Sequence, residues 1–255
     1  MNFHAVRGAI GFCSRLPVGA DERAFEAFTE TPGAFVLAAV PIGGIAGALI
    51  ATIVSVLGTN HPGTVGLGVV CVLYAVAGIN HLDGVADLGD VAVVHGDLSR
   101  RRAVLTDTTL GVGGTLFVCL VVIGVTIAGF ELASLPSLAV FTIVLAGELG
   151  AKGGMATIAC LGTPFRDGLG ATVLAGLATA DLRKPIALAA VITAGLCLLA
   201  PVALLTVCSG WAGALLVWRW ARRTLDGTNG DVFGCANEIG RLCALHVGVI
   251  TWTLW

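Results

Sequence analysis

The sequence predicts an all-α fold: a polytopic integral membrane helical bundle with about seven transmembrane helices. Three observations predict it. Of the 255 residues 56% are hydrophobic, only 12% are charged, and the apolar residues form runs long enough to cross a bilayer. A soluble domain would carry about a quarter charged residues. Because no linker or internal repeat interrupts the chain, we expect residues 1–255 to form a single membrane-embedded domain.

Each expected element follows from the pattern of apolar and charged residues. Residues 1–33 alternate the two kinds and predict a cytoplasmic or interfacial N-terminal segment with an amphipathic helix. The run at 186–218 is too long for one span and contains Pro201, so it predicts a helical hairpin. With this hairpin, seven helices are expected from the apolar runs near 34–57, 64–80, 110–130, 134–152, 186–218 and 239–255.

The distribution of charge predicts the orientation. With a cytoplasmic N-terminus, the connections 81–109, 153–185 and 219–238 share the cytoplasmic side. Every Lys and Arg then lies on that side or at a helix end facing it, as the positive-inside rule expects. Of the 14 basic and 16 acidic residues, only Glu131 falls on the opposite side. We therefore expect a multi-pass protein of the cell membrane whose active site faces the cytoplasm.

Composition also excludes some partners and bonds. The net charge of −2 gives no reason to expect a nucleic acid as partner. The eight cysteines are scattered without a CxxC pair, so we expect packing residues and no disulfide framework. Glu148 and Lys152 lie one helical turn apart within an apolar run and predict an ion pair, either functional or structural.

An acidic helix directly after the second apolar run predicts a metal site. Asp83, Asp87 and Asp90 are spaced at i, i+4 and i+7, so their carboxylates share one helical face. Like charges repel at this distance unless a cation neutralises them. Carboxylate oxygens without cysteine or paired histidine ligands suit Mg²⁺ or Mn²⁺. The alternative is a solvated acidic helix end.

Two further features extend this prediction to phosphate chemistry. The triplet from Arg100 to Arg102 places guanidinium groups near the carboxylates, which suits a diphosphate, although part of it can equally anchor the chain at lipid headgroups. A second polar cluster precedes the last span and places Asp231 and Glu238 seven residues apart on one helical face. We expect the two clusters to converge on one site. The alternative is a Gly-rich turn followed by a capped helix.

These motifs resemble the adenosylcobinamide-GDP ribazoletransferase, or cobalamin 5′-phosphate synthase, family over nearly the whole chain. Phe12-Cys-Ser-Arg-Leu-Pro-Val18 is similar to the family's F-x-T-R-L-P-V, and Asn80-His-Leu-Asp-Gly-Val-Ala-Asp-Leu-Gly-Asp90 to its H-L-D-G-L-A-D-x-x-D core. Other matching positions are Arg100, Asp107-Thr-Thr-Leu-Gly111, Gly168-Leu-Gly170 and Asn229-Gly-Asp-Val-Phe-Gly-Cys-Ala-Asn-Glu238. The departures from the family's usual residues are Val91, Thr109, Lys152 and Asn229.

The resemblance implies a Mg²⁺-dependent membrane enzyme of the last steps of cobalamin biosynthesis. Such an enzyme transfers the adenosylcobinamide phosphate moiety of adenosylcobinamide-GDP to α-ribazole, or to its 5′-phosphate, and releases GMP. The product is adenosylcobalamin or its 5′-phosphate. The expected partners are these substrates and the lipid bilayer, with other late cobalamin enzymes as further candidates. The oligomeric state stays open.

The site prediction assigns roles to individual residues. The catalytic residues are His81, Asp83 and Asp87, with His81 as acceptor of the hydroxyl proton. The alternative for His81 is a hydrogen-bonded interfacial histidine. The metal ligands are Asp83, Asp87, Asp90 and Asp231. The substrate-binding residues are Arg15, Arg100, Asn229 and Glu238.

Two other functions fit part of the pattern. A CDP-alcohol phosphotransferase also spaces Asp residues on membrane helices around Mg²⁺, but its signature has an Arg after the Ala, where this chain has Asp87. An ion transporter would use intramembrane carboxylates. Here the carboxylates gather at one surface, and no inverted repeat is evident.

Overall fold

The computed structural model describes residues 2–107 and 109–254, and this part of the chain is helical. It contains no strand, only an isolated bridge between Pro164 and Thr228. The all-α prediction is therefore confirmed. In chain order the α-helices are α1 (Phe3–Cys13), α2 (Glu22–Thr29), α3 (Gly33–Leu57), α4 (Pro62–Ala77), α5 (Asn80–Val93), α6 (Leu98–Val104), α7 (Val112–Leu132), α8 (Ser137–Leu161), α9 (Leu169–Ala175), α10 (Arg183–Cys197), α11 (Ala203–Leu225) and α12 (Gly230–Leu254). Short 3-10 turns lie at Gly58–Asn60 and Thr179–Leu182.

Every apolar run forms a helix, but the predicted number of seven spans is not confirmed. By length and composition, four helices can cross a membrane: α3 with its 3-10 extension, α7, α8 and α11. The pair α4 and α5, bent by 104° at a short break, is a fifth candidate. The predicted hairpin is present as α10 and α11, but α10 has only 15 residues. The last helix begins well before the predicted run and carries Asp231, Glu238 and Arg241.

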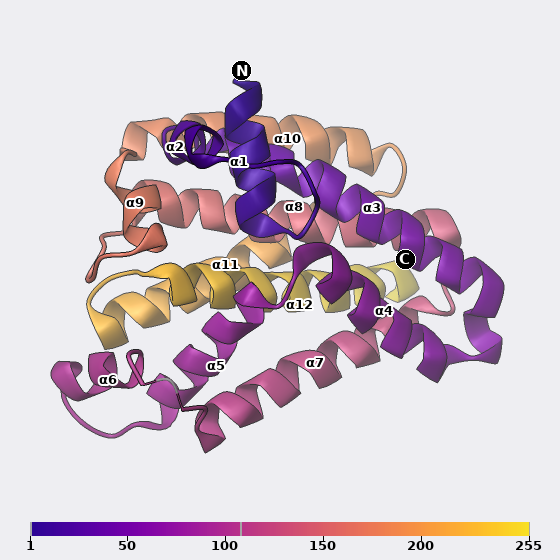
Figure 1. The fold of residues 1–255 in the computed structure, drawn as a ribbon. Coiled ribbons are helices and arrows are strands. Elements are labelled where there is room, and N and C mark those ends of the chain that lie inside the picture. The colour runs from indigo at the N-terminus through magenta and orange to yellow at the C-terminus, as the bar shows by residue number, and fades with distance from the viewer. Residues whose placement is uncertain (1, 108, 255) are drawn as a thin grey trace.

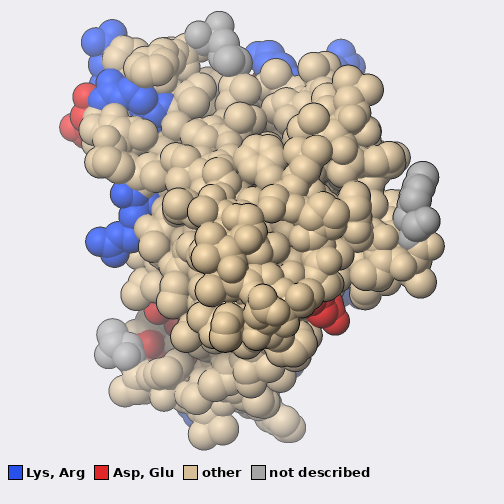
Figure 2. All heavy atoms as spheres, turned by 90° about the vertical axis from the view of Figure 1, so that its right-hand side faces the viewer, with Lys and Arg blue, Asp and Glu red and all other residues tan. Residues whose placement is uncertain are grey.

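The bundle has two ends of different character (Figure 1). One end carries α6, α9 and the connection between α11 and α12; the other carries the connections from α3 to α4 and from α7 to α8. Figure 2 views the second end and shows a mostly uncharged surface, with charged side chains gathered toward its edges. A charge-poor end is one half of the asymmetry that the sequence predicts.

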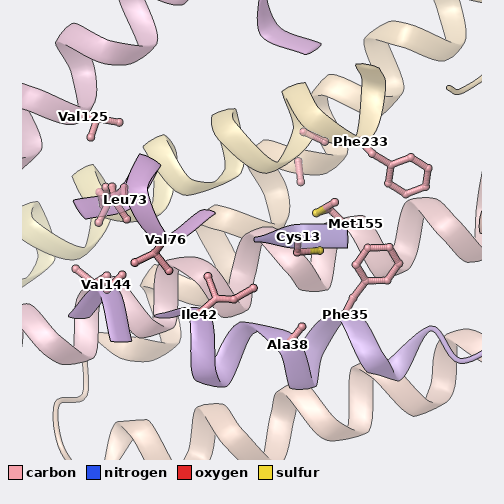
Figure 3. Close-up of a cluster of buried hydrophobic side chains, with 14 of the residues drawn as sticks. Cys13, Phe35, Ala38, Ile42, Leu73, Val76, Val125, Val144, Met155 and Phe233 are labelled. Atoms are coloured by element: carbon pink, nitrogen blue, oxygen red, sulfur yellow. The ribbon is translucent and has the colours of Figure 1, made fainter. Parts of the chain in front are cut away.

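The core lies around α8, which packs against α3, α11 and α12 and is buried along nearly its whole length. Figure 3 shows apolar side chains from several helices pointing toward one another in this core. The Phe35 and Phe233 rings stack with their centroids 6.2 Å apart, which joins α3 to α12. Cys13 of α1 is buried beside them. All eight cysteines are free, but Cys71, Cys119 and Cys208 are exposed, so the prediction of packing residues is confirmed for only some of them.

The N-terminal segment forms two helices. Asp21 caps α2 by accepting a hydrogen bond from the Ala24 N–H at 2.9 Å, and α2 buries Ala24 and Phe28 while its charged residues stay exposed. The helices α1 and α2 pack closely because Gly8 has no side chain. A Cβ at this position would lie only 2.1 Å from the Ala24 carbonyl oxygen. The amphipathic character is therefore found in α2. Its place in the cytoplasm or at the membrane surface stays a prediction.

A buried ionic cluster joins the middle of α8 to α12. Glu148 pairs with Lys152, as predicted, and also with Arg241. Arg241 Nη1 donates to both carboxylate oxygens of Glu238, at 2.7 and 2.8 Å, and Lys152 Nζ donates to Asn237 Oδ1 at 2.9 Å. None of these five residues is more than 1% exposed. Opposite charges therefore balance one another where water cannot reach them.

Removing one charge from this cluster should lower the free energy of unfolding of the protein. Glu148→Gln leaves Arg241 with Glu238 as its carboxylate partner and Lys152 with none, so we expect a loss of about 3–5 kcal/mol in stability, typical of breaking a buried pair. Thermal unfolding in detergent measures it. The matched control is Glu131→Gln, because Glu131 is exposed at the opposite end and forms no ion pair with another described residue. Equal melting temperatures of the two variants would contradict the cluster's stabilising role.

Candidate active site

A sharp bend between α4 and α5 turns the first acidic cluster toward the end of the bundle that carries α6. Gly78 ends α4 with a φ of 82°, a conformation that glycine adopts at little cost. The Arg15 N–H donates to the Val76 carbonyl at 2.9 Å, and the aliphatic part of the Arg15 side chain packs over Gly78. Arg15, predicted to bind substrate, therefore lies at this bend with its side chain exposed.

Two glycines allow α5 and α12 to pack backbone against backbone. A Cβ on Gly84 would lie 2.4 Å from the Asp231 carbonyl oxygen, and one on Gly234 would lie 2.9 Å from the His81 carbonyl oxygen. This close approach brings the carboxylates of Asp87 and Asp231 near enough to act on each other electrostatically. The Asp83 carboxylate is near enough for its charge to act on both. The structure thus brings the two acidic clusters together.

Two side chains hold Asp231 in place. Asn229 Nδ2 donates to Asp231 Oδ2 at 2.6 Å, and Asn229 Oδ1 accepts from the Val232 N–H at 3.2 Å in the first turn of α12. Arg166 Nη2 donates to the same Asp231 oxygen at 2.8 Å, while its Nη1 donates to the Leu105 carbonyl at 3.0 Å. Asn229 is only 2% exposed and orients Asp231, and its predicted part in binding substrate stays a prediction.

Sequence reasoning did not select Arg166. It lies in the irregular segment between α8 and α9, where no helical spacing and no cluster of like charge marks it. The only signal was its position two residues before the Gly168-Leu-Gly170 motif. In the structure it joins this segment to both α12 and the chain after α6.

A cavity of about 360 Å³ opens beside α5 and is lined by three carboxylates, those of Asp83, Asp87 and Asp107. The hydroxyl and backbone N–H of Thr109 donate to Asp107 and hold the pKa of that carboxyl below its usual range, so it stays ionised. The remaining lining residues are Ala86, Leu105, Thr106, Thr109 and Leu110. Thr108, part of the motif noted above, lies outside the described residues. The cavity has the size of a small-molecule site and the charge to attract a cation.

Asp90 has a structural task at the start of α7. Its Oδ2 accepts from the Gly111 N–H and its Oδ1 from the Gly114 N–H, both at 2.8 Å. A carboxylate at a helix N-terminus satisfies free N–H groups and is favoured by the helix dipole. Both oxygens of Asp90 are thus engaged in fastening α7 to α5. Its part as a metal ligand stays a prediction.

Three other predicted residues do not reach the cavity. His81 is 7% exposed, and its ring lies 6.5 Å from that of Phe12, on the side of α5 that faces α1. Its Nδ1 has no hydrogen-bond partner in the part of the chain that is described. Glu238 belongs to the buried ionic cluster, where Arg241 and Tyr74 donate to it. Arg100 is exposed on α6. These positions favour packing or support for His81 and Glu238; the predicted roles stay untested.

Another member of the arginine triplet ties two elements together. The guanidinium of Arg102 donates to the Leu225 carbonyl from Nε at 3.0 Å and from Nη2 at 2.7 Å. It also lies over the Phe165 ring, 4.8 Å from the centroid. Arg102 therefore holds α6 against the end of α11 and the segment after α8. The three connections predicted to share one side of the membrane do meet at one end of the bundle.

The side chains at the cavity suit Mg²⁺, which takes part of its ligands from water and substrate, better than a metal ion whose ligands all come from the protein. Among the described residues no group of three or more His, Cys, Asp or Glu side chains is arranged to hold a metal ion. Mg²⁺, however, usually keeps several waters and binds one or two carboxylates together with substrate phosphates. The neighbouring carboxylates of Asp87 and Asp231 match that requirement in number and chemistry, and the Arg166 guanidinium already supplies one positive charge beside Asp231.

The fold and the site define a helical membrane protein with a carboxylate-lined cavity at one end of its bundle. The family described as cobalamin-5-phosphate synthase matches residues 5–249. The chain belongs to this family. It is 43% identical to a protein of Halorubrum lacusprofundi over 98% of each chain, and 49% identical to one of Halobacterium salinarum over 77% of this chain and 98% of that protein. Both relatives are named adenosylcobinamide-GDP ribazoletransferase. No solved structure matches the chain.

Proposed function

We propose that this protein catalyses the reaction for which its relatives are named. It transfers the adenosylcobinamide phosphate moiety of adenosylcobinamide-GDP to α-ribazole, or to its 5′-phosphate, and releases GMP. The observation that carries the proposal is the meeting of Asp87 and Asp231 beside the cavity, in a chain that belongs to this family. Family membership favours this reaction over a CDP-alcohol phosphotransfer or ion transport.

The reaction is a displacement at phosphorus. A hydroxyl oxygen of the ribazole ribose forms a bond to the phosphorus that carries the cobinamide arm, the bond from that phosphorus to the GMP oxygen breaks, and the hydroxyl proton is released. Negative charge spreads over the phosphoryl oxygens and the leaving oxygen. Bound Mg²⁺ supplies positive charge for both. Arg166 adds a guanidinium that donates to the Asp231 carboxylate at 2.8 Å.

Each residue near the cavity then has a defined part. Asp87 and Asp231 would hold Mg²⁺, with Asn229 keeping Asp231 in position. A general base must lie within hydrogen-bond reach of the proton that it accepts. Asp83 is exposed and lines the cavity, whereas His81 faces α1, so the geometry favours Asp83 as the proton acceptor. We place this end of the bundle on the cytoplasmic side of the cell membrane, because the basic residues gather there.

Incubation of the purified protein with adenosylcobinamide-GDP, α-ribazole and Mg²⁺ tests the proposal. We expect GMP and adenosylcobalamin in equal amounts by chromatography, no product in excess EDTA, and recovery with Mg²⁺ or Mn²⁺, because the site offers oxygen ligands only. A parallel reaction with α-ribazole 5′-phosphate identifies the acceptor. If neither acceptor leads to release of GMP from adenosylcobinamide-GDP, the proposed function is wrong. Full turnover in excess EDTA would contradict the requirement for a metal ion but leave the proposed reaction intact.

A further inference from the structure

The hairpin of α10 and α11 carries an apolar groove on the outside of the bundle, and none of its lining residues lines the carboxylate cavity. The groove has a volume of about 670 Å³ and runs the length of α10, which packs against α3, α8 and α11 (Figure 1). Cys197 and Leu204 line it near the turn of the hairpin, and Ile186 and Leu215 line it at the opposite end. Trp211 lies between these ends on α11. Its walls are almost entirely apolar.

The length of the groove matches one leaflet of a bilayer. From Leu204 to Leu215, α11 rises about 16 Å at 1.5 Å per residue. The hydrocarbon core of a membrane is roughly 30 Å thick, so each leaflet contributes about half of that. Since α11 is one of the four membrane-span candidates, its groove lies at the depth of lipid chains. A single acyl chain has the right shape and chemistry to fill it.

The groove leads into a basic pocket at Leu215. This pocket, about 370 Å³ in volume, is lined by Leu215, Trp218, Arg219, Arg222 and Arg223, all on α11. Arg222 lies over the Trp218 ring, 5.0 Å from its centroid. The groove and the basic pocket share Leu215, so an apolar stretch and a cluster of guanidinium groups adjoin along α11.

The first turn of α10 carries two more positive charges. Arg183 and Lys184 begin α10, just before Ile186, which lines the groove together with Leu215. All five basic side chains, on both helices, are exposed. In the described part of the chain, none of the five forms an ion pair with an acidic side chain. This concentration of uncompensated positive charge calls for an anionic partner.

We propose that the groove and the basic pocket together bind one anionic phospholipid. Its acyl chain lies in the groove between α10 and α11, and its phosphate headgroup contacts Arg219, Arg222 and Arg223. Guanidinium groups bind phosphate through paired hydrogen bonds, and basic residues at the end of a span attract anionic lipids. A zwitterionic lipid would place its own cation among the arginines, so the site selects an anionic headgroup. The lipid fills the space beside α10, a helix too short to span the membrane alone.

Quenching of Trp211 fluorescence by brominated lipid tests this proposal. The protein is reconstituted in phosphatidylcholine bilayers that contain a small fraction of either dibrominated phosphatidylglycerol or dibrominated phosphatidylcholine. The difference in fluorescence between the wild type and Trp211→Phe gives the contribution of Trp211. At equal fraction, we expect the anionic lipid to quench at least about fivefold more effectively, the preference expected from a single basic contact. The triple variant Arg219→Gln, Arg222→Gln, Arg223→Gln should lose the preference, whereas Arg23→Gln, an exposed arginine on α2, should keep it.

Native mass spectrometry of the wild-type protein gives an independent reading if the triple variant does not fold. We expect retention of phosphatidylglycerol in preference to phosphatidylcholine from an equal mixture. Equal quenching and equal retention of the two lipids would reduce the groove to ordinary lipid contact and overturn the proposal. The proposal would also be overturned if Trp211 is not quenched and cysteines placed on α10 cross-link two copies of the protein. A second copy would then cover the groove.

Discussion

Replacing Asp87 by Asn should lower kcat at least about 100-fold, the loss typical of removing one electrostatic stabiliser from an active site. The substitution keeps the size of the side chain and deletes its charge. Asp87 lines the cavity and adjoins Asp231, so in our proposal its loss removes half of the pair that holds Mg²⁺. The apparent affinity for Mg²⁺, measured from the dependence of rate on metal concentration, should fall in the same variant.

The matched control for this variant is Asp226→Asn. Asp226 is exposed, lies five residues before Asp231 and has a φ of 52°, a left-handed conformation that Asn also adopts readily. It should keep the wild-type rate and metal dependence. Near-normal turnover of Asp87→Asn, with an equally active control, would show that the acidic helix is only a solvated helix end.

Substitution of Gly84 by Ala should lower activity about 100-fold without touching any polar side chain. The new Cβ would lie 2.4 Å from the Asp231 carbonyl oxygen and 3.0 Å from both the Asp231 Cα and the Cys235 nitrogen. These are backbone atoms, so α5 and α12 must move apart. A misplacement of about 1 Å in an active site costs on the order of 100-fold in rate, and overpacking costs about 1–3 kcal/mol in stability.

Gly44→Ala is the control for this helix contact. Gly44 also lies within a long helix, but a Cβ there meets nothing within 4 Å. It should retain activity and thermal stability. If Gly84→Ala turns over as fast as Gly44→Ala, the close contact of α5 with α12 does not position the carboxylates.

The sequence predicts the helices well because long apolar runs have few other structures available in a membrane. It predicts their number as membrane spans less well. The last helix continues back to Gly230 through a polar stretch, since the charges of Glu238 and Arg241 are neutralised by each other and by Glu148 on α8. The helical spacing of Asp231 and Glu238 is visible in the sequence, but the pairing of Arg241 with the distant Glu148 is not, so the sequence predicts a connection for this stretch and not a part of the last helix.

Helical spacing explains which site residues could be predicted. Asp83 and Asp87 are four residues apart and share the face of α5 that meets the cavity. His81 is two residues from Asp83, and residues at that spacing do not face each other on a helix. Its turn toward α1 therefore follows from the same geometry. Glu238 shares a face with Asp231 but lies two turns deeper, about 10 Å along α12, where it meets Arg241.

The central claim is that Asp87 on α5 and Asp231 on α12 act in one metal and phosphate site, and a double-mutant cycle tests it most directly. The values of kcat are measured for the wild type, Asp87→Asn, Asp231→Asn and the double variant under saturating Mg²⁺ and substrates. Residues that act as a unit are strongly non-additive. We predict that each single variant loses at least about 100-fold and that the double variant is within about threefold of the slower single one. Rate losses that multiply fully in the double variant would show two independent roles and contradict a shared site.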